Sequence, residues 1–335
     1  MEQVRFAVIG INHGHIYSQI GFLLDGGAEF TSFFATEPEL IAPFQSVFSQ
    51  AVQKSSIEEI LEDETIQMIV TAGINNERAP LGIRAMQYGK DFMTDKPGFT
   101  TLQQLEEARR VQAETGRIYS ICFSERLGNK ATVKASALVA DGVIGRVIQT
   151  VGLGPHRANP KQRPAWYFKK EQYGGILCDI ASHQIDQFLY FTDSTSAEVV
   201  QSQVGNFNHP EYPELEDFGD IVLRNQNASG YIRVDWFTPD GLSTWGDGRL
   251  FLLGTEGYLE IRKNIDIEGR PGGDHLFIVN NQAAKYIDCS DVALQYGKQL
   301  VYDVVHRTET AMPQAHCFMA SELALKAETQ AIRIA

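Results

Sequence analysis

The stretch that decides the fold is "VRFAVIGINHGH", Val4 to His15, near the start of the 335-residue chain. Up to Gly10 it is a nearly continuous apolar run that ends in glycine, which is typical of a buried parallel strand. A helix pattern follows from about His15 to Leu24 and ends at a pair of glycines. The stretch therefore predicts a strand, a tight glycine turn and a helix, which is the first half of a βαβ unit.

Strand and helix patterns continue to alternate as far as Phe123. Further strands are predicted over 28–35, 66–73 and 91–94 and in "IYSICF", and helices between them begin with capping boxes such as Thr101 with Gln104. This alternation indicates βαβ units and a parallel sheet. After Phe123, strand-like runs joined by turns that contain Gly and Asn predict a mostly antiparallel sheet, and helices are predicted over 291–305 and 313–333.

The predicted fold class is therefore α/β, with a Rossmann-type parallel sheet domain (residues 1–124) followed by an α+β domain (residues 125–335) with a large, mostly antiparallel open sheet. A net charge of −13 argues against nucleic acid or an anionic membrane as a partner. The four cysteines form no CxxC pair and lie among apolar residues, which indicates a reducing compartment. With no signal-peptide pattern and no apolar stretch long enough for a bilayer, the chain is predicted to be cytoplasmic.

The glycine turn after the first strand is a variant of the dinucleotide fingerprint GxGxxG. Gly10 takes the first position, Asn12 and His15 replace the second and third glycines, and Gly14 lies between them. Asn tolerates positive φ, so we expect Asn12 to preserve the turn. The turn opens a helix and so offers its N-terminus to a phosphate, although a plain βα turn without a ligand remains an alternative.

The end of the second predicted strand indicates which dinucleotide binds. An acidic residue there bonds the ribose of NAD, whereas an arginine suits the additional phosphate of NADP. Ala35 occupies the expected acidic position, and Glu37 lies two residues further on. With no Lys or Arg adjacent, the sequence favours NAD over NADP.

A second stretch, "YGGILCDIASHQIDQFLY" from Tyr173 to Tyr190, is predicted to be a buried helix that carries two ionisable groups, Asp179 and His183. Residues four apart share a helix face, so both side chains can point into one cleft. An imidazole is suited to act as a general base near neutral pH. A buried, mutually satisfied pair remains the alternative, and Asp186 lacks the further ligands that a metal site would need.

Three stretches together resemble the Gfo/Idh/MocA family of oxidoreductases: "GINHGH", "YGKDFMTDKPGFTT" and "GGILCDIASHQID". The resemblance implies that Lys96 is the active-site lysine, that Asp179 and His183 are its catalytic partners, and that Asp95 stands at the position of the family's glutamate. It also implies that Pro97 forms a turn near the nicotinamide. The chain departs from the family in the glycine turn, at Ala35, and at Arg78, where many members have a histidine.

These observations predict an NAD(P)-dependent oxidoreductase that transfers hydride between nicotinamide and a hydroxyl or carbonyl carbon of a sugar, sugar acid or cyclitol. The alternatives are a redox-neutral NAD-dependent glycosidase and a non-enzymatic sensor of NAD(P) or sugar. The resemblance also implies a homodimer or homotetramer that assembles through the sheet of the second domain. No metal is predicted. The predicted residues are catalytic Lys96, Asp179 and His183; cofactor-binding Gly10, Asn12, His13, Gly14, His15, Glu37, Asp95 and Pro97; and substrate-binding Arg126, His156, Arg157 and Trp166.

Overall fold

The computed structural model of the protein describes residues 3–335, which form two compact units. The first unit contains residues up to Cys122 together with Glu171–Gly174 and Gln295–Phe318. The second contains Phe123–Lys170, Gly175–Leu294 and Met319–Ala335. A single boundary near residue 124 does not describe this arrangement, because residues 295–318 belong with the first unit.

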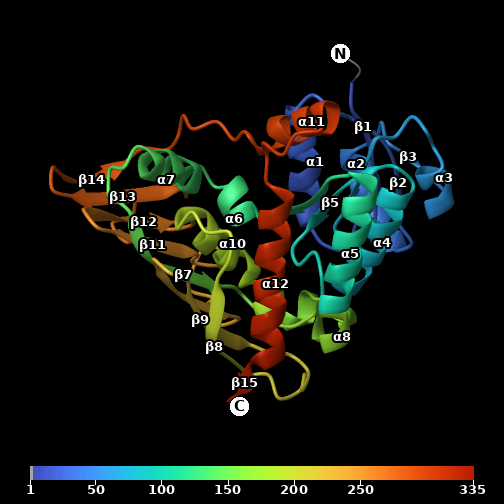
Figure 1. Cartoon of the computed structure of the whole chain (residues 1–335). Helices are drawn as coiled ribbons and strands as arrows, with labels where there is room; N and C mark the ends of the chain where they lie inside the picture. Colours follow the sequence, from blue (N-terminus) through green and yellow to red (C-terminus); the bar gives the residue numbers. More distant parts are fainter. Residues whose placement is uncertain (1–2) are drawn as a thin grey trace. The chain divides into compact units, whose positions relative to one another are not determined.

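The first unit is built on a six-stranded parallel sheet, as the alternating pattern predicts (Figure 1). Its strand order β3-β2-β1-β4-β5-β6 is that of a Rossmann fold, in which the chain reverses its winding direction between β1 and β4. The strands are β1 (Arg5–Ile9), β2 (Glu29–Phe34), β3 (Val52–Gln53), β4 (Met68–Thr71), β5 (Asp91–Asp95) and β6 (Tyr119–Cys122). The edge strand β3 was not predicted, because two exposed residues carry no alternation.

The helices of the first unit are α1 (His15–Asp25), α2 (Pro38–Val47), α3 (Ile57–Leu61), α4 (Asn75–Gln87), α5 (Leu102–Thr115) and α11 (Tyr296–His306). The predicted cap of α5 is present, since Thr101 accepts a hydrogen bond from the Gln104 N–H at 3.2 Å. Gly82 brings α4 close to the sheet, because a Cβ there would lie 2.6 Å from the rings of Phe92 and Tyr119. The α11 helix starts five residues later than predicted.

The second unit is built on a nine-stranded sheet in the order β14-β13-β12-β11-β7-β10-β9-β8-β15, which confirms the predicted large and mostly antiparallel sheet. Within the described part of this nine-stranded sheet, only the pairs β7–β10 and β8–β15 run parallel. The strands are β7 (Val147–Pro155), β8 (Glu198–Gly205), β9 (Phe218–Arg224), β10 (Ser229–Asp235), β11 (Arg249–Gly254), β12 (Gly257–Arg262), β13 (His275–Asn280), β14 (Ala284–Ile287) and β15 (Ile332–Arg333).

One face of this sheet is covered by helices, and α7 (Lys130–Ala140) and α10 (Ser182–Phe191) can be followed there in Figure 1. Alternate residues such as Leu250, Leu252 and Leu259 point to this face and pack with Ala131 and Ala135 of α7. The remaining helices are the short α6 (Ser124–Leu127), α8 (Lys170–Tyr173) and α9 (Ile176–Asp179), and α12 (Gln314–Gln330), whose residues are divided between the two units. Within residues 3–335, no helix combines the length and the apolar character needed to cross a bilayer.

The predicted continuous helix from Tyr173 to Tyr190 is wrong in one respect. The segment is broken into α9 and α10, with Ile180 and Ala181 between them. The His183 N–H bonds the carbonyl of Ile180 at 3.2 Å, not that of Asp179 as in a regular α-helix. The argument that Asp179 and His183 share the face of one helix therefore does not hold, although both side chains are buried. The predicted last helix likewise ends at Gln330, before β15.

Candidate functional site

The turn after β1 has the geometry expected of the first fingerprint glycine. Gly10 has φ of +82°, and a Cβ there would lie 3.0 Å from the Cα of Gly73, which follows β4. The His13 N–H donates to the carbonyl of Ala72 at 2.9 Å, so the turn is fixed between the carboxyl ends of two neighbouring strands. These strand ends lie at the switch point of the sheet, where open α/β folds bind ligands.

The turn is preserved with Asn12 in it, as predicted, but Asn12 is not among the residues with positive φ. Its side-chain amide instead donates to Glu37 Oε1 at 2.7 Å. The other carboxylate oxygen of Glu37 accepts from the N–H of Thr36 at 3.2 Å. The structure thus fixes Glu37 beside the glycine turn, near the position where the fingerprint expects its acidic residue.

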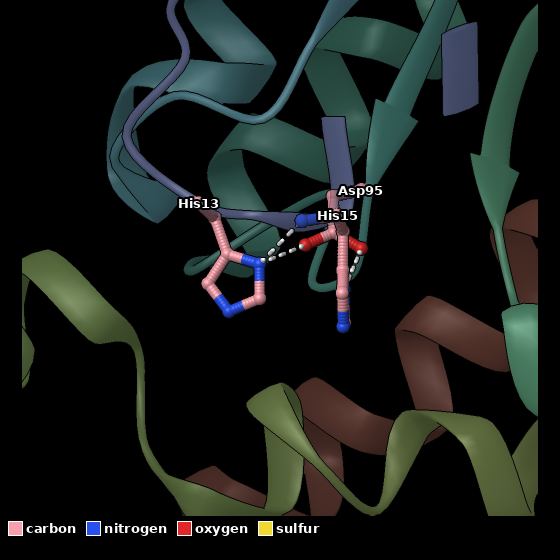
Figure 2. Close-up of side chains that lie close together, drawn as sticks. All are labelled: His13, His15 and Asp95. Atoms are coloured by element: carbon pink, nitrogen blue, oxygen red, sulfur yellow. Dashed lines mark hydrogen bonds and ion pairs between the residues drawn. The ribbon is translucent and has the colours of Figure 1, made fainter. Parts of the chain in front are cut away.

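The two histidines of the turn gather around the carboxylate of Asp95 at the end of β5, as Figure 2 shows. His15 Nδ1 lies 3.0 Å from Asp95 Oδ1, and His13 Nδ1 lies 3.5 Å from Asp95 Oδ2. The rings of His13 and His15 meet edge to face, with centroids 4.2 Å apart. Three predicted cofactor-binding residues, from two distant parts of the sequence, therefore lie together.

The electrostatics of this group leave Asp95 ionised and His13 neutral. Burial alone would raise the pKa of Asp95, but His15 and Arg78 hold it well below its usual range. Burial lowers the pKa of His13 well below 6.5, and His15 adds to this effect. His13 Nδ1 also accepts the backbone N–H of His15 at 3.3 Å, which requires that nitrogen to be unprotonated.

His13, His15 and Asp95 also offer three ligand atoms within 4.8 Å of one another, and these residue types are typical of transition-metal sites. However, Arg78 Nη2 lies 3.5 Å from Asp95 Oδ2, and His13 Nδ1 already accepts a backbone hydrogen bond. A metal ion bound through these two atoms would have to displace both contacts.

Arg78 is a residue of this region whose role the sequence did not reveal. Its guanidinium is buried and donates to the carbonyls of Gly73 at 2.8 Å and Lys96 at 2.5 Å. A longer hydrogen bond of 3.2 Å reaches the carbonyl of Pro97, across the cis Lys96–Pro97 peptide. Arg78 thereby connects the turn after β4 to the turn that carries Lys96. Its only sequence signal was that it replaces a histidine of the family pattern.

In the second unit, Asp179 and His183 are buried, with 3% and 2% of their surface exposed. Tyr167 donates its hydroxyl to Asp179 Oδ2 at 2.9 Å, and the ring of Phe123 lies edge-on to His183 with centroids 6.3 Å apart. Tyr167 is a residue that sequence reasoning missed as a partner of Asp179, although it lies next to the predicted Trp166 in "PAWYF".

A connected group of aromatic rings extends from Tyr167. Arg163 lies over the rings of Tyr167 and Trp236, at 4.2 and 4.4 Å from their centroids. His156 contacts Trp236 and also Trp245, whose centroid lies 4.5 Å away. Trp245 is 46% exposed, so one end of this group faces solvent. Aromatic faces beside polar groups suit the apolar faces and hydroxyl edge of a sugar ring.

The other predicted substrate-binding residues already have partners within the second unit. Arg126 makes a two-pronged ion pair with Asp186, with both N···O distances 2.7 Å. Arg157 donates to the carbonyls of Pro239 and Leu242 at 2.9 and 2.6 Å. Trp166 is 8% exposed and packs against Tyr167. Asp186, considered above as a metal ligand, is thus the partner of Arg126.

Comparison with known proteins identifies the family. Residues 4–123 match the family described as "Oxidoreductase family, NAD-binding Rossmann fold", and residues 132–260 match the "GFO/IDH/MocA C-terminal domain". The chain belongs to the Gfo/Idh/MocA family of oxidoreductases, as the three motifs predicted.

Three individual proteins show how near its relatives are. A D-xylose dehydrogenase of Paenarthrobacter nicotinovorans is 26% identical over 49% of this chain and 44% of its own length. A scyllo-inositol 2-dehydrogenase (NAD(+)) of Bacillus subtilis is 24% identical over 75% of this chain and 69% of its own. A crystal structure from Erwinia carotovora atroseptica SCRI1043, named only provisionally as an oxidoreductase, is 46% identical, covers 99% of this chain and 100% of its own, and has a TM-score of 0.97.

The chain spans less than half the length of the first curated relatives that it matches, at 44%, 42% and 36%. The family fixes the fold and the NAD-binding character of the first unit. It does not fix a substrate.

The residues present fit a dinucleotide at the turn after β1. No side chain caps the N-terminus of α1, and its first turn contains no acidic residue. A Cβ on Gly14 would have no neighbour within 4 Å, so there is open space at the helix end. An uncapped helix N-terminus with open space beside it is suited to a pyrophosphate.

Proposed function

We propose that the protein is an NAD(P)-dependent oxidoreductase that transfers hydride between nicotinamide and a hydroxyl or carbonyl carbon of a sugar, sugar acid or cyclitol. The observation that carries the proposal is the Rossmann turn with an uncapped α1 N-terminus, together with a buried Lys96 at the end of β5. Its relatives support the substrate class, since two are named as dehydrogenases of D-xylose and scyllo-inositol.

We propose NAD as the preferred cofactor. The carboxylate of Glu37, held by Asn12, can accept hydrogen bonds from a ribose. Glu77 adds a second acidic group nearby: burial raises its pKa, and the charge of Glu37 raises it further. Two neighbouring carboxylates disfavour the additional phosphate of NADP.

The protein's own groups would supply proton transfer and charge stabilisation, while the bound cofactor accepts or supplies the hydride. His183 is proposed as the general base that takes the hydroxyl proton, a role worth roughly 10²–10⁴-fold in rate. Lys96 is proposed to stabilise the negative charge that develops on the oxygen. Asp179, held by the Tyr167 hydroxyl, is proposed to orient the substrate or the imidazole.

Titration calorimetry with NAD and NADP, followed by a panel of sugars and polyols read by nicotinamide absorbance, tests this proposal. Binding of NAD together with an absorbance change on a sugar or cyclitol would support it. Binding without an absorbance change on any substrate would instead favour the redox-neutral glycosidase or the sensor. If neither nucleotide bound, the proposal would be wrong.

Two buried lysines at the two ends of β5 give a matched test of the role of Lys96. Lys90 and Lys96 are each 4% exposed, but Lys90 donates to the carbonyls of Asp63 and Ile66 at the amino end of the strand. Lys96→Met should lower kcat at least a hundredfold and retain NAD binding. Lys90→Met should lower stability and leave kcat within a few-fold. Equal effects of the two substitutions on kcat would contradict a catalytic role for Lys96.

We also propose that the protein forms a homodimer or homotetramer through the face of the nine-stranded sheet opposite α7 and α10. That face carries a set of aromatic side chains that are exposed or half-buried: Tyr231, Phe251, Tyr258, Phe277 and Tyr286. Apolar surface of this kind favours self-association. Light scattering of the wild type and of Phe251→Asp tests this oligomeric state, with a shift to monomer expected for the variant.

A cytoplasmic location is proposed because the four cysteines are buried and free.

A further inference from the structure

Two buried carboxylates and one ammonium group surround the first turn of α9, the helix that ends at Asp179. Glu216 precedes β9, Glu328 lies on α12 and Lys170 opens α8, so the three come from distant parts of the second unit. Lys170 Nζ bonds Oε1 of both carboxylates. The side chains of Glu216 and Glu328 are 1% and 8% exposed. We call these three residues the carboxylate brace.

The brace holds the backbone of α9 directly. The N–H of Ile176 donates to Glu216 Oε2 at 3.0 Å, and the N–H of Leu177 donates to Glu328 Oε2 at 3.0 Å. These are N–H groups of a helix start, which have no partner within the helix itself. The residue before the helix, Gly175, provides no side-chain cap. Two remote carboxylates therefore do what a local capping residue does elsewhere.

The brace also explains why residue 175 is glycine. Gly175 has φ of +98°, which side chains rarely adopt. A Cβ there would overlap the carboxylate of Glu328. The glycine is needed both for the turn and for the close approach of the brace.

Asp179 depends on this first turn because α9 has only four residues. The N–H of Asp179 bonds the carbonyl of Gly175 at 2.9 Å, so the backbone of Asp179 is hydrogen-bonded to the residue next to the brace. On its other side α9 packs against β9, where a Cβ on Gly219 would lie 2.6 Å from Leu177. A shift of the first turn would move the Asp179 carboxylate relative to Tyr167.

We propose that Glu328 and Glu216, bridged by Lys170, are positioning residues that place Asp179 for the reaction, and that protonation of Glu328 loosens this placement. The inference rests on the proposed function only in that Asp179 takes part in the reaction. Glu328 touches neither substrate nor cofactor in this scheme.

The geometry shows why one proton matters. All four oxygens of Glu216 and Glu328 accept a hydrogen bond, from Lys170 or from a backbone N–H. A protonated Glu328 carries an O–H group that would face either the Lys170 ammonium or the Leu177 N–H, and both of these are donors. One of the two contacts of Glu328 must then rearrange. Burial, and then the charge of Glu216, raise the pKa of Glu328 to about 7, while Lys170 opposes the rise. Cys178 also faces this cluster, since burial raises the pKa of its thiol and the charge of Glu328 raises it further. The carboxylate of Glu214 accepts the backbone N–H of Lys170 at 3.1 Å.

Hydrogen–deuterium exchange of the full-length protein tests the positioning role without any substrate. Glu328→Gln keeps the size of the side chain but puts an amide in place of one accepting oxygen beside Lys170. Exchange in peptides that contain Ile176–Asp179 should become about tenfold faster, as expected for losing a hydrogen bond to a charged group. The control is Glu322→Gln on the same helix, whose carboxylate pairs with Lys326 at 2.6 Å and lies outside the brace. Unchanged exchange in Glu328→Gln would overturn the proposal.

Kinetics with a substrate from the panel test the role of the proton. The ratio of wild-type kcat to Glu328→Gln kcat should rise about tenfold between pH 5.5 and pH 8.5, with KM and NAD affinity unchanged. The ratio removes any pH dependence that the two proteins share. A ratio that is constant with pH, as a purely structural role predicts, would overturn the protonation step. If no substrate is turned over, the proposed function fails, while the exchange experiment still decides whether the brace holds α9.

Discussion

Arg126 offers a test of whether a predicted substrate-binding residue is instead structural. Its Nε and Nη2 each lie 2.7 Å from a carboxylate oxygen of Asp186, and the two side chains are 9% and 0% exposed. The guanidinium also lies 4.6 Å from the centroid of the Tyr190 ring. Removing one partner of such a buried pair leaves the other charge uncompensated, which costs about 3–5 kcal/mol.

We therefore expect Arg126→Met to lower the free energy of unfolding of the second unit by about 3–5 kcal/mol. The double variant Arg126→Met/Asp186→Leu should recover most of that loss, because replacing a buried ion pair with apolar side chains is often close to neutral. Urea unfolding followed by tryptophan fluorescence measures this selectively. All three tryptophans, Trp166, Trp236 and Trp245, lie in the second unit.

The reasoning would be refuted if Arg126→Met changed stability by less than about 1 kcal/mol and instead raised KM, the behaviour of a side chain that binds substrate. It would also be refuted if the double variant were as unstable as the single one, since the loss would then not come from an unpaired Asp186. A coupling energy close to the single-variant loss is the expected result of the double-mutant cycle.

Three further predictions concern the first unit. Glu37→Gln should weaken NAD binding about tenfold, which is the smallest effect expected from losing a hydrogen bond to a charged group. NADP binding, measured by the same calorimetry, should not weaken. The pKa of His13 is lower in the folded state than in the unfolded state, so the free energy of unfolding should fall as pH drops below about 6.5, by up to about 1.4 kcal/mol per pH unit for one proton. Urea unfolding at pH 7.5 and pH 5.5 should show a smaller loss of stability between the two pH values in His13→Asn than in the wild type. Gly82→Ala should destabilise the unit by about 1–3 kcal/mol because a methyl group would clash with two buried rings, whereas Gly21→Ala, in a helix and without neighbours within 4 Å, should stabilise it slightly.

Local signals in the sequence predicted most of the fold. The apolar run that ends at Gly10, the capping residue Thr101 and the alternation of strand and helix each depend on neighbouring residues only, and the structure confirms them. Some elements were missed. The strands β3 and β15 have two exposed residues each and form only by pairing with a neighbouring strand. The helix α2 and the strand β14 were missed as well. The break between α9 and α10 could not be predicted, because Ile180 and Ala181 include no proline or glycine, the residues that usually mark such a break.

The site residues were harder to interpret because their partners are distant in sequence. Arg126 lies 60 residues from Asp186, and Asp95 lies 80 residues from His15. No spacing rule connects such positions, so the sequence could name the residue types but not their pairings. Tyr167, which bonds Asp179 from twelve residues away, was missed for the same reason.

The departures of this chain from the glycine fingerprint are connected to one another in the structure. Asn12, in place of the second glycine, holds Glu37, which lies two residues beyond the usual acidic position. His15, in place of the third glycine, bonds Asp95, which stands where the family pattern has the longer glutamate. Each substitution in the turn thus supplies a hydrogen bond to an acidic residue that itself departs from the family pattern, Glu37 in its position and Asp95 in its side-chain length. The two pairs of changes keep the turn in place with residues other than those of the usual fingerprint, which is why the bare motif is weak in the sequence although the Rossmann turn forms.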